Sequence, residues 1–294
     1  MKKKFFLKLK GPQKIAIVYR LRTPEAVELA TKTALWLKEL GHTVFTAPEQ
    51  NKLNGTQLLK KTKELNQIAL TIVFGGDGTY LRAVRLFHGT STPILGFNMG
   101  NLGFLTVHNS SDFKKEIETA LNGKMCLFPR SMLQTEIYRK GKLRATYCAL
   151  NDLVIERGSN SQLLNCAIYS EKHLVSQVRA DGFIVSTPTG STAYNLSAGG
   201  PLMHPQVKAL IVTPVAPHSL TSRPLIFPDD RDLKIKLDNK SLKAHVVIDG
   251  VKTDELSHED EVSITKSKFC HYVVRNTDHS FFHLLRDKLR FGDR

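Results

Sequence analysis

Residues 68–74, IALTIVF, are apolar at every position but one, and the run stops at Gly75-Gly76. Near-continuous apolar runs of this length are typical of strands that are buried on both faces, as in parallel sheets. Similar runs lie at 14–20 and 92–98, and helical periodicity lies between the three. This part of the chain therefore predicts a parallel sheet with crossover helices.

The alternation of strand and helix extends from residue 14 to residue 123. Apolar side chains recur at helical spacing in 24–40, with Pro24 suited to the first turn and Gly41 to the end. We expect strands at 14–20, 42–47, 68–74 and 92–98, and helices at 24–40, 56–65, 80–87 and 113–123. The order indicates a doubly wound α/β domain.

After Gly123 the pattern becomes strand–turn–strand, with turn signals at 140–142 and at Asp249-Gly250 and only a short helix near Ser197. The tail at 279–292 has amphipathic helical spacing and is expected to return to the first domain. Its expected buried side consists of Phe281, Leu284, Leu285 and Leu289. We predict an α/β domain of residues 1–123 with 275–294, and a mostly β domain of residues 124–274.

The formal net charge of +15 indicates either an ordinary basic surface or an anionic partner such as a nucleotide, a polyphosphate or a nucleic acid. The lysines are spread along the chain, which argues against nucleic acid as the partner.

The basic N-terminus has only Phe5–Leu7 as an apolar stretch, too short for a secretion signal, so we expect a mobile lead-in. No run reaches the roughly 18 apolar residues of a membrane span. The four cysteines lack metal-ligand spacing and are predicted to be reduced thiols in a cytoplasmic protein.

GGDGT, residues 75–79, follows the central apolar run. Its glycines allow positive φ and leave room for a ligand, and the helix that follows offers free amides and a positive dipole end. We therefore expect a cradle for donor phosphates at Gly75, Gly76, Gly78 and Thr79. The alternative is a tight turn in which Asp77 caps the helix.

A carboxylate in a phosphate cradle is explained if the second ligand is a hydroxyl group. An attacking sugar hydroxyl must be oriented and must lose its proton, and Asp77 can do both. Arg82 lies one turn along the helix, where it either meets the phosphates or is an ordinary surface arginine.

Three further motifs have the composition of ligand-binding loops. GFNMGNLGFLT (96–106) is rich in glycine at the end of a strand, although Phe97, Leu102 and Phe104 could simply pack it. Asn151-Asp152 can bind an amide or base edge and ribose hydroxyls, but it is also ordinary turn chemistry. RADGFIVSTPTGSTAYNLSAGGP (179–201) packs five hydroxyl residues into one loop, more than a turn needs, which favours a nucleotide.

Together with TPVAPHSLTSRPLIFP (213–228), these motifs occur in an order and at a spacing that resemble the NAD kinase family over most of residues 14–275. The resemblance implies phosphorylation of the adenosine-ribose 2′-hydroxyl of NAD, with ATP or polyphosphate as donor and a divalent metal ion such as Mg²⁺. It also implies an active site in a cleft between the two domains, and a homo-oligomer, a dimer or a tetramer. Asp77 matches the catalytic aspartate of the family. The positions that match NAD contacts are Asp77, Gly78, Arg82, Asn151, Asp152, Arg179, Asp181, Thr189, Thr192, Ala193, Tyr194, Asn195, Leu196 and Ser197.

One position departs from the family pattern: Val251 stands where the family commonly has glutamine, so that contact is not expected here. Three other functions remain open from the sequence: a lipid kinase with a related GGDG motif, a non-catalytic nucleotide sensor and a basic nucleic-acid-binding protein. Lipid kinases typically have Asn-Glu after GGDGT, whereas this chain has Tyr80-Leu81.

Overall fold

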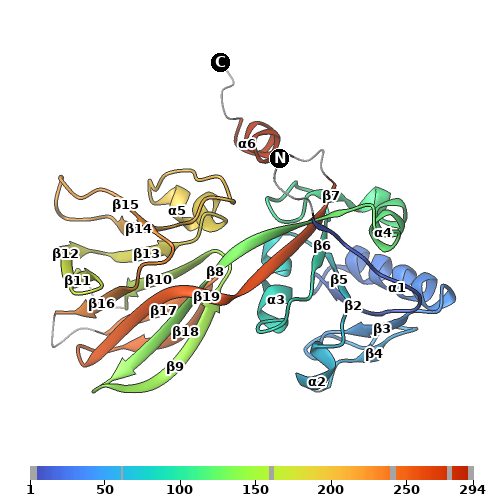
Figure 1. Ribbon diagram of the computed structural model, residues 1–294, viewed down its shortest axis with the longest axis horizontal. Coiled ribbons are helices and arrows are strands. Elements are labelled where there is room, and N and C mark those ends of the chain that lie inside the picture. Colours follow the sequence, from blue (N-terminus) through green and yellow to red (C-terminus); the bar gives the residue numbers. More distant parts are fainter. Residues whose placement is uncertain (1–4, 61, 159–161, 239–242, 277–279, 291–294) are drawn as a thin grey trace. The chain divides into compact units, whose positions relative to one another are not determined.

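The computed structural model describes residues 5–60, 62–158, 162–238, 243–276 and 280–290 (Figure 1). The chain forms two compact units, which we call unit 1 (residues 1–129 and 271–294) and unit 2 (residues 130–270). Two long strands, β8 (Cys126–Arg139) and β19 (Asp260–Arg275), each begin in one unit and end in the other.

Unit 1 contains a parallel sheet in the order β6-β5-β2-β3-β4, and the last residues of β19 pair with β6 in parallel. Its strands are β1 (Phe5–Phe6), β2 (Lys14–Tyr19), β3 (Thr43–Thr46), β4 (Gln57–Leu58), β5 (Leu70–Phe74), β6 (Ile94–Asn98) and β7 (His108–Asn109). Its helices are α1 (Pro24–Glu39), α2 (Thr62–Leu65), α3 (Asp77–Leu86), α4 (Phe113–Leu121), α6 (Phe281–Leu289) and the 3₁₀ turn η1 (Ser110–Asp112).

Helices cover both faces of this sheet. Ile15 and Ile17 of β2 lie in one apolar cluster with the buried residues of α1 and α4, whereas Ala16 lies in a second cluster with Phe87 at the end of α3. Successive residues of a strand point to opposite faces, so the two clusters lie on opposite sides of the sheet. The predicted doubly wound α/β domain is confirmed.

Two local predictions in unit 1 are wrong. The expected helix at 56–65 is instead the short strand β4, which pairs with β3, followed by the single turn α2. Pairing with an available sheet edge outweighs a weak helical pattern. In the lead-in expected to be mobile, Phe5-Phe6 form β1, which pairs with the start of β8, and the next residue, Leu7, is buried; positions 1–4 lie outside the described residues.

Unit 2 is a sandwich of two antiparallel sheets. One has the order β12-β11-β16-β19, with β8 and β9 continuing beside β19, and the other has the order β15-β14-β13-β10-β17-β18. A single apolar cluster, which includes Leu133, Ile168, Phe183 and Val246, takes residues from both sheets. The remaining elements are β9 (Lys142–Ala149), β10 (Asp152–Arg157), β11 (Leu164–Ser170), β12 (His173–Ala180), β13 (Gly182–Ser186), η2 (Gly190–Thr192), α5 (Tyr194–Ser197), β14 (Ala209–Val215), β15 (Leu225–Pro228), β16 (Leu233–Leu237), β17 (Ala244–Ile248) and β18 (Val251–Leu256). The mostly β second domain is confirmed.

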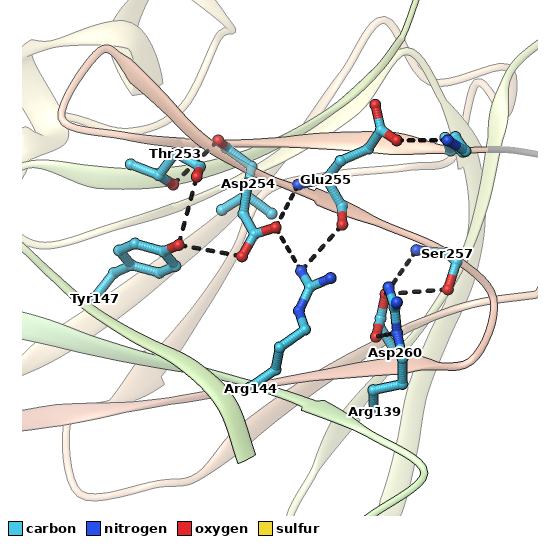
Figure 2. A network of polar contacts seen from close by, with 10 residues as sticks. Arg139, Arg144, Tyr147, Thr253, Asp254, Glu255, Ser257 and Asp260 are labelled. Carbon is cyan, nitrogen blue, oxygen red and sulfur yellow. Dashed lines mark hydrogen bonds and ion pairs between the residues drawn. The ribbon is translucent and has the colours of Figure 1, made fainter. Parts of the chain in front are cut away.

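A polar network links the two sheets of unit 2 (Figure 2). Asp254 of β18 forms an ion pair with Arg144 and accepts a hydrogen bond from the hydroxyl of Tyr147 at 3.1 Å, both from β9. Close by, Arg139 donates two hydrogen bonds of 2.8 Å to Asp260. The contacts of Arg144 and Tyr147 hold the β17–β18 hairpin against β9.

The C-terminal helix is α6, capped at its start by Ser280, whose hydroxyl accepts a hydrogen bond from the amide of His283. Phe281, Leu284 and Leu285 are buried as expected, whereas Leu289 is only half-buried. Lys288 donates a 2.6 Å hydrogen bond to the carbonyl of Leu102, so the helix contacts unit 1 as predicted. Positions 279, 291 and 292 of the expected helix lie outside the described residues.

Candidate active site

Helix α3 begins directly at the GGDGT motif, at the carboxyl end of β5. The amides of Asp77 and Gly78 have no hydrogen-bond partner within the described part of the chain, and no side chain caps the helix. The glycines do not act through positive φ, because none of the three adopts it. Gly75 is needed for space: a Cβ there would lie 2.4 Å from the hydroxyl of Thr79. Gly76 and Gly78 have open space around them, which leaves the helix start accessible to an anion.

Asp77 does not cap its helix; its carboxylate instead binds the loop after β6. Oδ2 accepts the amide of Phe104 at 2.9 Å, and Oδ1 accepts the amides of Leu105 and Thr106, each at 3.1 Å. The hydroxyl of Thr106 adds a fourth bond to the carboxylate, the third on Oδ1, also at 3.1 Å. Each carboxylate oxygen can accept about two hydrogen bonds, so Oδ2 retains one acceptor position. The residue is half-buried.

The glycine-rich motif 96–106 is built around this carboxylate. A Cβ at Gly103 would lie 2.1 Å from Oδ1 of Asp77, so only glycine lets the loop approach it. Asn98 is buried and ties the base of the loop by donating to the carbonyls of Thr106 and His108 at 3.4 and 3.0 Å. The interpretation that apolar side chains pack the loop holds for Phe97, which is fully buried, and less for Leu102 and Phe104, which are half-buried.

Arg82 is not a free surface arginine. Its Nη2 donates a 2.5 Å hydrogen bond to the carbonyl of Tyr19 at the end of β2, and its Nε lies 3.5 Å from a carboxylate oxygen of Glu49. Burial lowers the pKa of the guanidinium, partly offset by Glu49 and Tyr19. Nε is buried and makes no hydrogen bond within the described residues.

In unit 2, the turn 150–152 is held by another carboxylate. Asp249 accepts three consecutive amides, those of Leu150 at 2.9 Å, Asn151 at 2.8 Å and Asp152 at 3.2 Å. The carbonyl of Asn151 in turn accepts the amide of Thr187 at 2.9 Å. Sequence reasoning treated Asp249 only as a turn residue, and nothing local in the sequence signals its long-range contacts.

Asp152 is 4% exposed. Burial, together with the negative charge of Asp249, raises the pKa of its carboxyl group to about 7. Its carboxyl group accepts no hydrogen bond from the described residues. A carboxyl group that is buried and unpaired in this way is a common property of functional sites.

Most hydroxyl groups of the loop 187–194 do not have the role predicted for them, which was to bind a nucleotide. Thr187, Ser191 and Thr192 donate their hydroxyls to backbone carbonyls of the protein itself, at 2.6, 2.8 and 3.3 Å. These hydroxyls hold the loop in shape, so the argument that a simple loop does not need them is wrong. Thr189 and Tyr194 have no such partner among the described residues, and they are the hydroxyls left for a ligand.

The other residues of the run 192–197, all predicted to contact the ligand, differ in how far they are exposed. Asn195 is fully buried, and its side chain bonds the carbonyls of Ser191 and Pro201 and the hydroxyl of Thr213. It can therefore meet a ligand only through its backbone. Ala193 and Leu196 are half-buried, and Ser197 is exposed.

Arg179 and Asp181 flank the end of β12. Asp181 forms a 3.0 Å ion pair with Arg157, whereas the exposed Arg179 has no charged partner among the described residues. Arg179 lines a cavity of about 500 Å³ together with apolar residues that include Phe183 and Val212. His218 and Arg223 also line it, so the lining is mixed, with apolar and polar side chains.

Within the described residues there is no cluster of three or more potential metal ligands. Nor does any helix in the described ranges have the length and apolar character to cross a membrane.

An acid beside the uncapped amides of a helix is the arrangement expected of a phosphotransferase that binds a nucleotide. The family model described as ATP-NAD kinase N-terminal domain matches residues 15–125, and the model of the ATP-NAD kinase C-terminal domain matches residues 150–276. The chain is 59% identical to an NAD kinase of Bdellovibrio bacteriovorus, over 98% of this chain and 95% of that relative. It is 41% identical to an NAD kinase of Ruminiclostridium cellulolyticum, over 76% of this chain and 79% of that relative.

Two solved structures share the fold. The crystal structure of yeast NADH kinase complexed with NADH has a TM-score of 0.90 and 26% identity, and covers 97% of this chain and 89% of its own. An NAD kinase from Archaeoglobus fulgidus in complex with ATP has a TM-score of 0.72 and 26% identity, and covers 95% of this chain and 99% of its own. The chain belongs to the NAD kinase family, and it is a phosphotransferase with an alcohol group as acceptor.

Proposed function

We propose that this protein transfers the terminal phosphoryl group of ATP, or of polyphosphate, to the 2′-hydroxyl of the adenosine ribose of NAD, forming NADP. The observation that carries the proposal is the open acceptor position on Oδ2 of Asp77, next to the uncapped amides of α3. The relatives named NAD kinase and the ATP complex of one of them support both substrates.

In this mechanism, the ribose hydroxyl donates its hydrogen bond to Oδ2 of Asp77. As the 2′-oxygen bonds to the terminal phosphorus, the bond from phosphorus to the leaving ADP oxygen breaks and the proton passes to Asp77. The backbone amides of Gly76, Asp77 and Gly78, with Thr79, bind the donor phosphates, and Arg82 adds a positive charge. Because the phosphoryl transition state is loose, positioning and charge neutralisation supply most of the rate.

Binding of the dinucleotide is assigned to unit 2, which we propose as the NAD-binding domain. Asn151 and Asp152 contact the base and ribose, Thr189 and Tyr194 use their unpaired hydroxyls, and the exposed Arg179 meets the pyrophosphate. The backbone of residues 192–197 completes the contact surface. The side chains of Asp152, Thr189, Tyr194 and Arg179 have no hydrogen-bond or charged partner among the described residues, which supports this assignment.

A divalent cation such as Mg²⁺ fits this site only when it binds together with the phosphates of the donor. Mg²⁺ is commonly held by one or two carboxylates together with substrate phosphates, so the lack of a three-ligand cluster among the described residues is compatible with it. When bound, it would neutralise phosphate charge beside Asp77.

Incubation with NAD, ATP and Mg²⁺, followed by an NADP-specific dehydrogenase, tests the function. We expect NADP from the wild type and at least about 100-fold slower formation of NADP by Asp77→Asn. Parallel reactions with diacylglycerol test the lipid-kinase alternative: phosphate transfer to the lipid and not to NAD would refute the proposal.

We further propose that the protein is a cytoplasmic homo-oligomer, a dimer or a tetramer. All four cysteines are free thiols, as expected in a reducing compartment. Two edge strands of unit 2 expose apolar side chains, with Leu174 on β12 52% exposed and Ile226 on β15 55% exposed. Such edges are normally covered. Light scattering on wild type and Ile226→Asp checks the assembly, and a wild-type monomer would refute it.

A further inference from the structure

The two-residue turn between β17 and β18 reaches beyond its own hairpin. Asp249 and Gly250 have φ values of 46° and 76°, the left-handed pair that a tight hairpin turn requires. Glycine adopts this conformation freely and aspartate tolerates it, as would asparagine. Turn chemistry alone therefore does not require a carboxylate at position 249.

The carboxylate has a second use, which is to hold the turn that precedes β10. It accepts the three amides of residues 150–152 at 2.8 to 3.2 Å, and its own amide donates a 3.0 Å bond to the carbonyl of Asp152. Hydrogen bonds to an ionised acceptor are roughly twice as strong as neutral ones. Four contacts in one place fix the direction in which Asn151 and Asp152 leave the backbone.

The hairpin that carries Asp249 is itself anchored. Leu153 of β10 pairs with Ile248, next to the turn, and Asp254 on the far side of the hairpin is held by Arg144 and Tyr147 (Figure 2). The carboxylate is thus presented by a rigid element.

We propose that Asp249 is a positioning residue of the NAD site: its carboxylate fixes the backbone of residues 150–152 and thereby aims Asn151 and Asp152 at the dinucleotide. The inference rests on the proposed function and extends it to a residue that does not itself contact the substrate. The geometry also lets Asp249 act through charge, because an acid held this close to Asp152 disfavours a second negative charge.

Because Asp249 also acts through its charge, replacing it should shift the pH dependence of NAD use, which replacing a purely structural residue would not do. Asp249 adds to burial in raising the pKa of Asp152 to about 7. Two other titratable side chains belong to elements around this turn: Cys148 at the end of β9, whose pKa is also raised by burial, and Tyr194 in α5. Strand β13 carries no titratable residue, and His245 of β17 pairs with Glu156 further along the sheet.

The test is kcat/KM for NAD measured from pH 5 to pH 9, a profile that reports groups of the free enzyme. In the wild type, kcat/KM rises through about pH 7 as Asp152 ionises and can accept the ribose hydroxyls. In Asp249→Asn, we expect KM for NAD to increase at least about tenfold, KM for ATP to stay within about twofold, and the midpoint of the rise to move to lower pH.

Glu255→Gln is the matched control, because it removes a carboxylate from the same hairpin that pairs with Lys243 and contacts none of the amides of 150–152. It leaves the midpoint unchanged. An unchanged KM for NAD and an unchanged midpoint in Asp249→Asn would overturn the inference.

Amide hydrogen exchange separates this outcome from a failure of the proposed function. In Asp249→Asn the amides of residues 150–152 exchange faster than in the wild type, whatever reaction the enzyme catalyses, and unchanged exchange overturns the positioning role. A wild type that forms no NADP refutes the proposed function instead.

Discussion

Asp152→Asn removes one buried titratable group, and its effect on stability follows from the raised pKa. Between about pH 4 and pH 7 the unfolded chain has lost this proton while the folded protein retains it, since the pKa moves from 3.8 to about 7 on folding. The folded state then binds more protons, so the free energy of unfolding of the wild type falls as pH rises across this window. Above about pH 7 both states are ionised and the loss is complete.

The size of the effect is set by the shift. One pKa unit corresponds to ~1.4 kcal/mol, so a shift of about three units corresponds to about 4 kcal/mol. Asparagine has a similar shape and no charge. We expect Asp152→Asn to equal the wild type near pH 4 and to be more stable by about 4 kcal/mol at pH 8 without NAD. The same variant should bind NAD more weakly, since the ionised acceptor is lost.

Urea unfolding followed by far-ultraviolet circular dichroism, at half-unit steps of pH, measures this difference. Fluorescence would be a poor probe, because the single tryptophan, Trp36, lies in unit 1. Asp260→Asn is a control for which we expect the opposite change in the free energy of unfolding. Burial raises the pKa of Asp260, but bonds from Arg139 and Ser257 outweigh it and the net pKa is lowered. That variant loses stability at neutral pH, and its loss shrinks toward pH 3. A stability difference for Asp152→Asn that is constant from pH 4 to pH 8 would refute the reasoning.

Three further outcomes are expected in unit 1. Asp77→Asn lowers kcat at least about 100-fold and changes the dissociation constant of NAD by less, as measured by steady-state kinetics and calorimetry; equal losses would indicate a purely structural turn. Gly103→Ala places a Cβ 2.1 Å from Oδ1 of Asp77, so thermal unfolding should show a loss of about 1–3 kcal/mol together with reduced turnover. Lys288 bonds the carbonyl of Leu102 and lies 5.4 Å from the ring of Phe104, so Lys288→Met should speed amide exchange of Phe104. Arg286→Met, on the same helix, should not.

Several elements could be predicted from the sequence because their signals are local. Pro24 and the helical spacing after it place α1 within one residue of its observed end, and the apolar run before Gly75 marks β5. Hairpin turns such as 140–141 follow from residues that tolerate positive φ. Each of these features depends on neighbours a few residues apart.

The sequence by itself determined the alternation of strands and helices, the change to a β pattern after Gly123, and the position of Asp77 in a turn that leads into a helix, although the helix was expected only from residue 80 and begins at Asp77. Only the tertiary structure decided what Asp77 and Asp249 bind, and that three hydroxyls of the 187–194 loop are used internally. The partners of Asp77 lie 27 to 29 residues away and those of Asp249 lie 97 to 99 residues away. Periodicity and turn propensity act over a few residues, whereas these contacts exist because strand pairing brings distant loops to the same edge of a sheet.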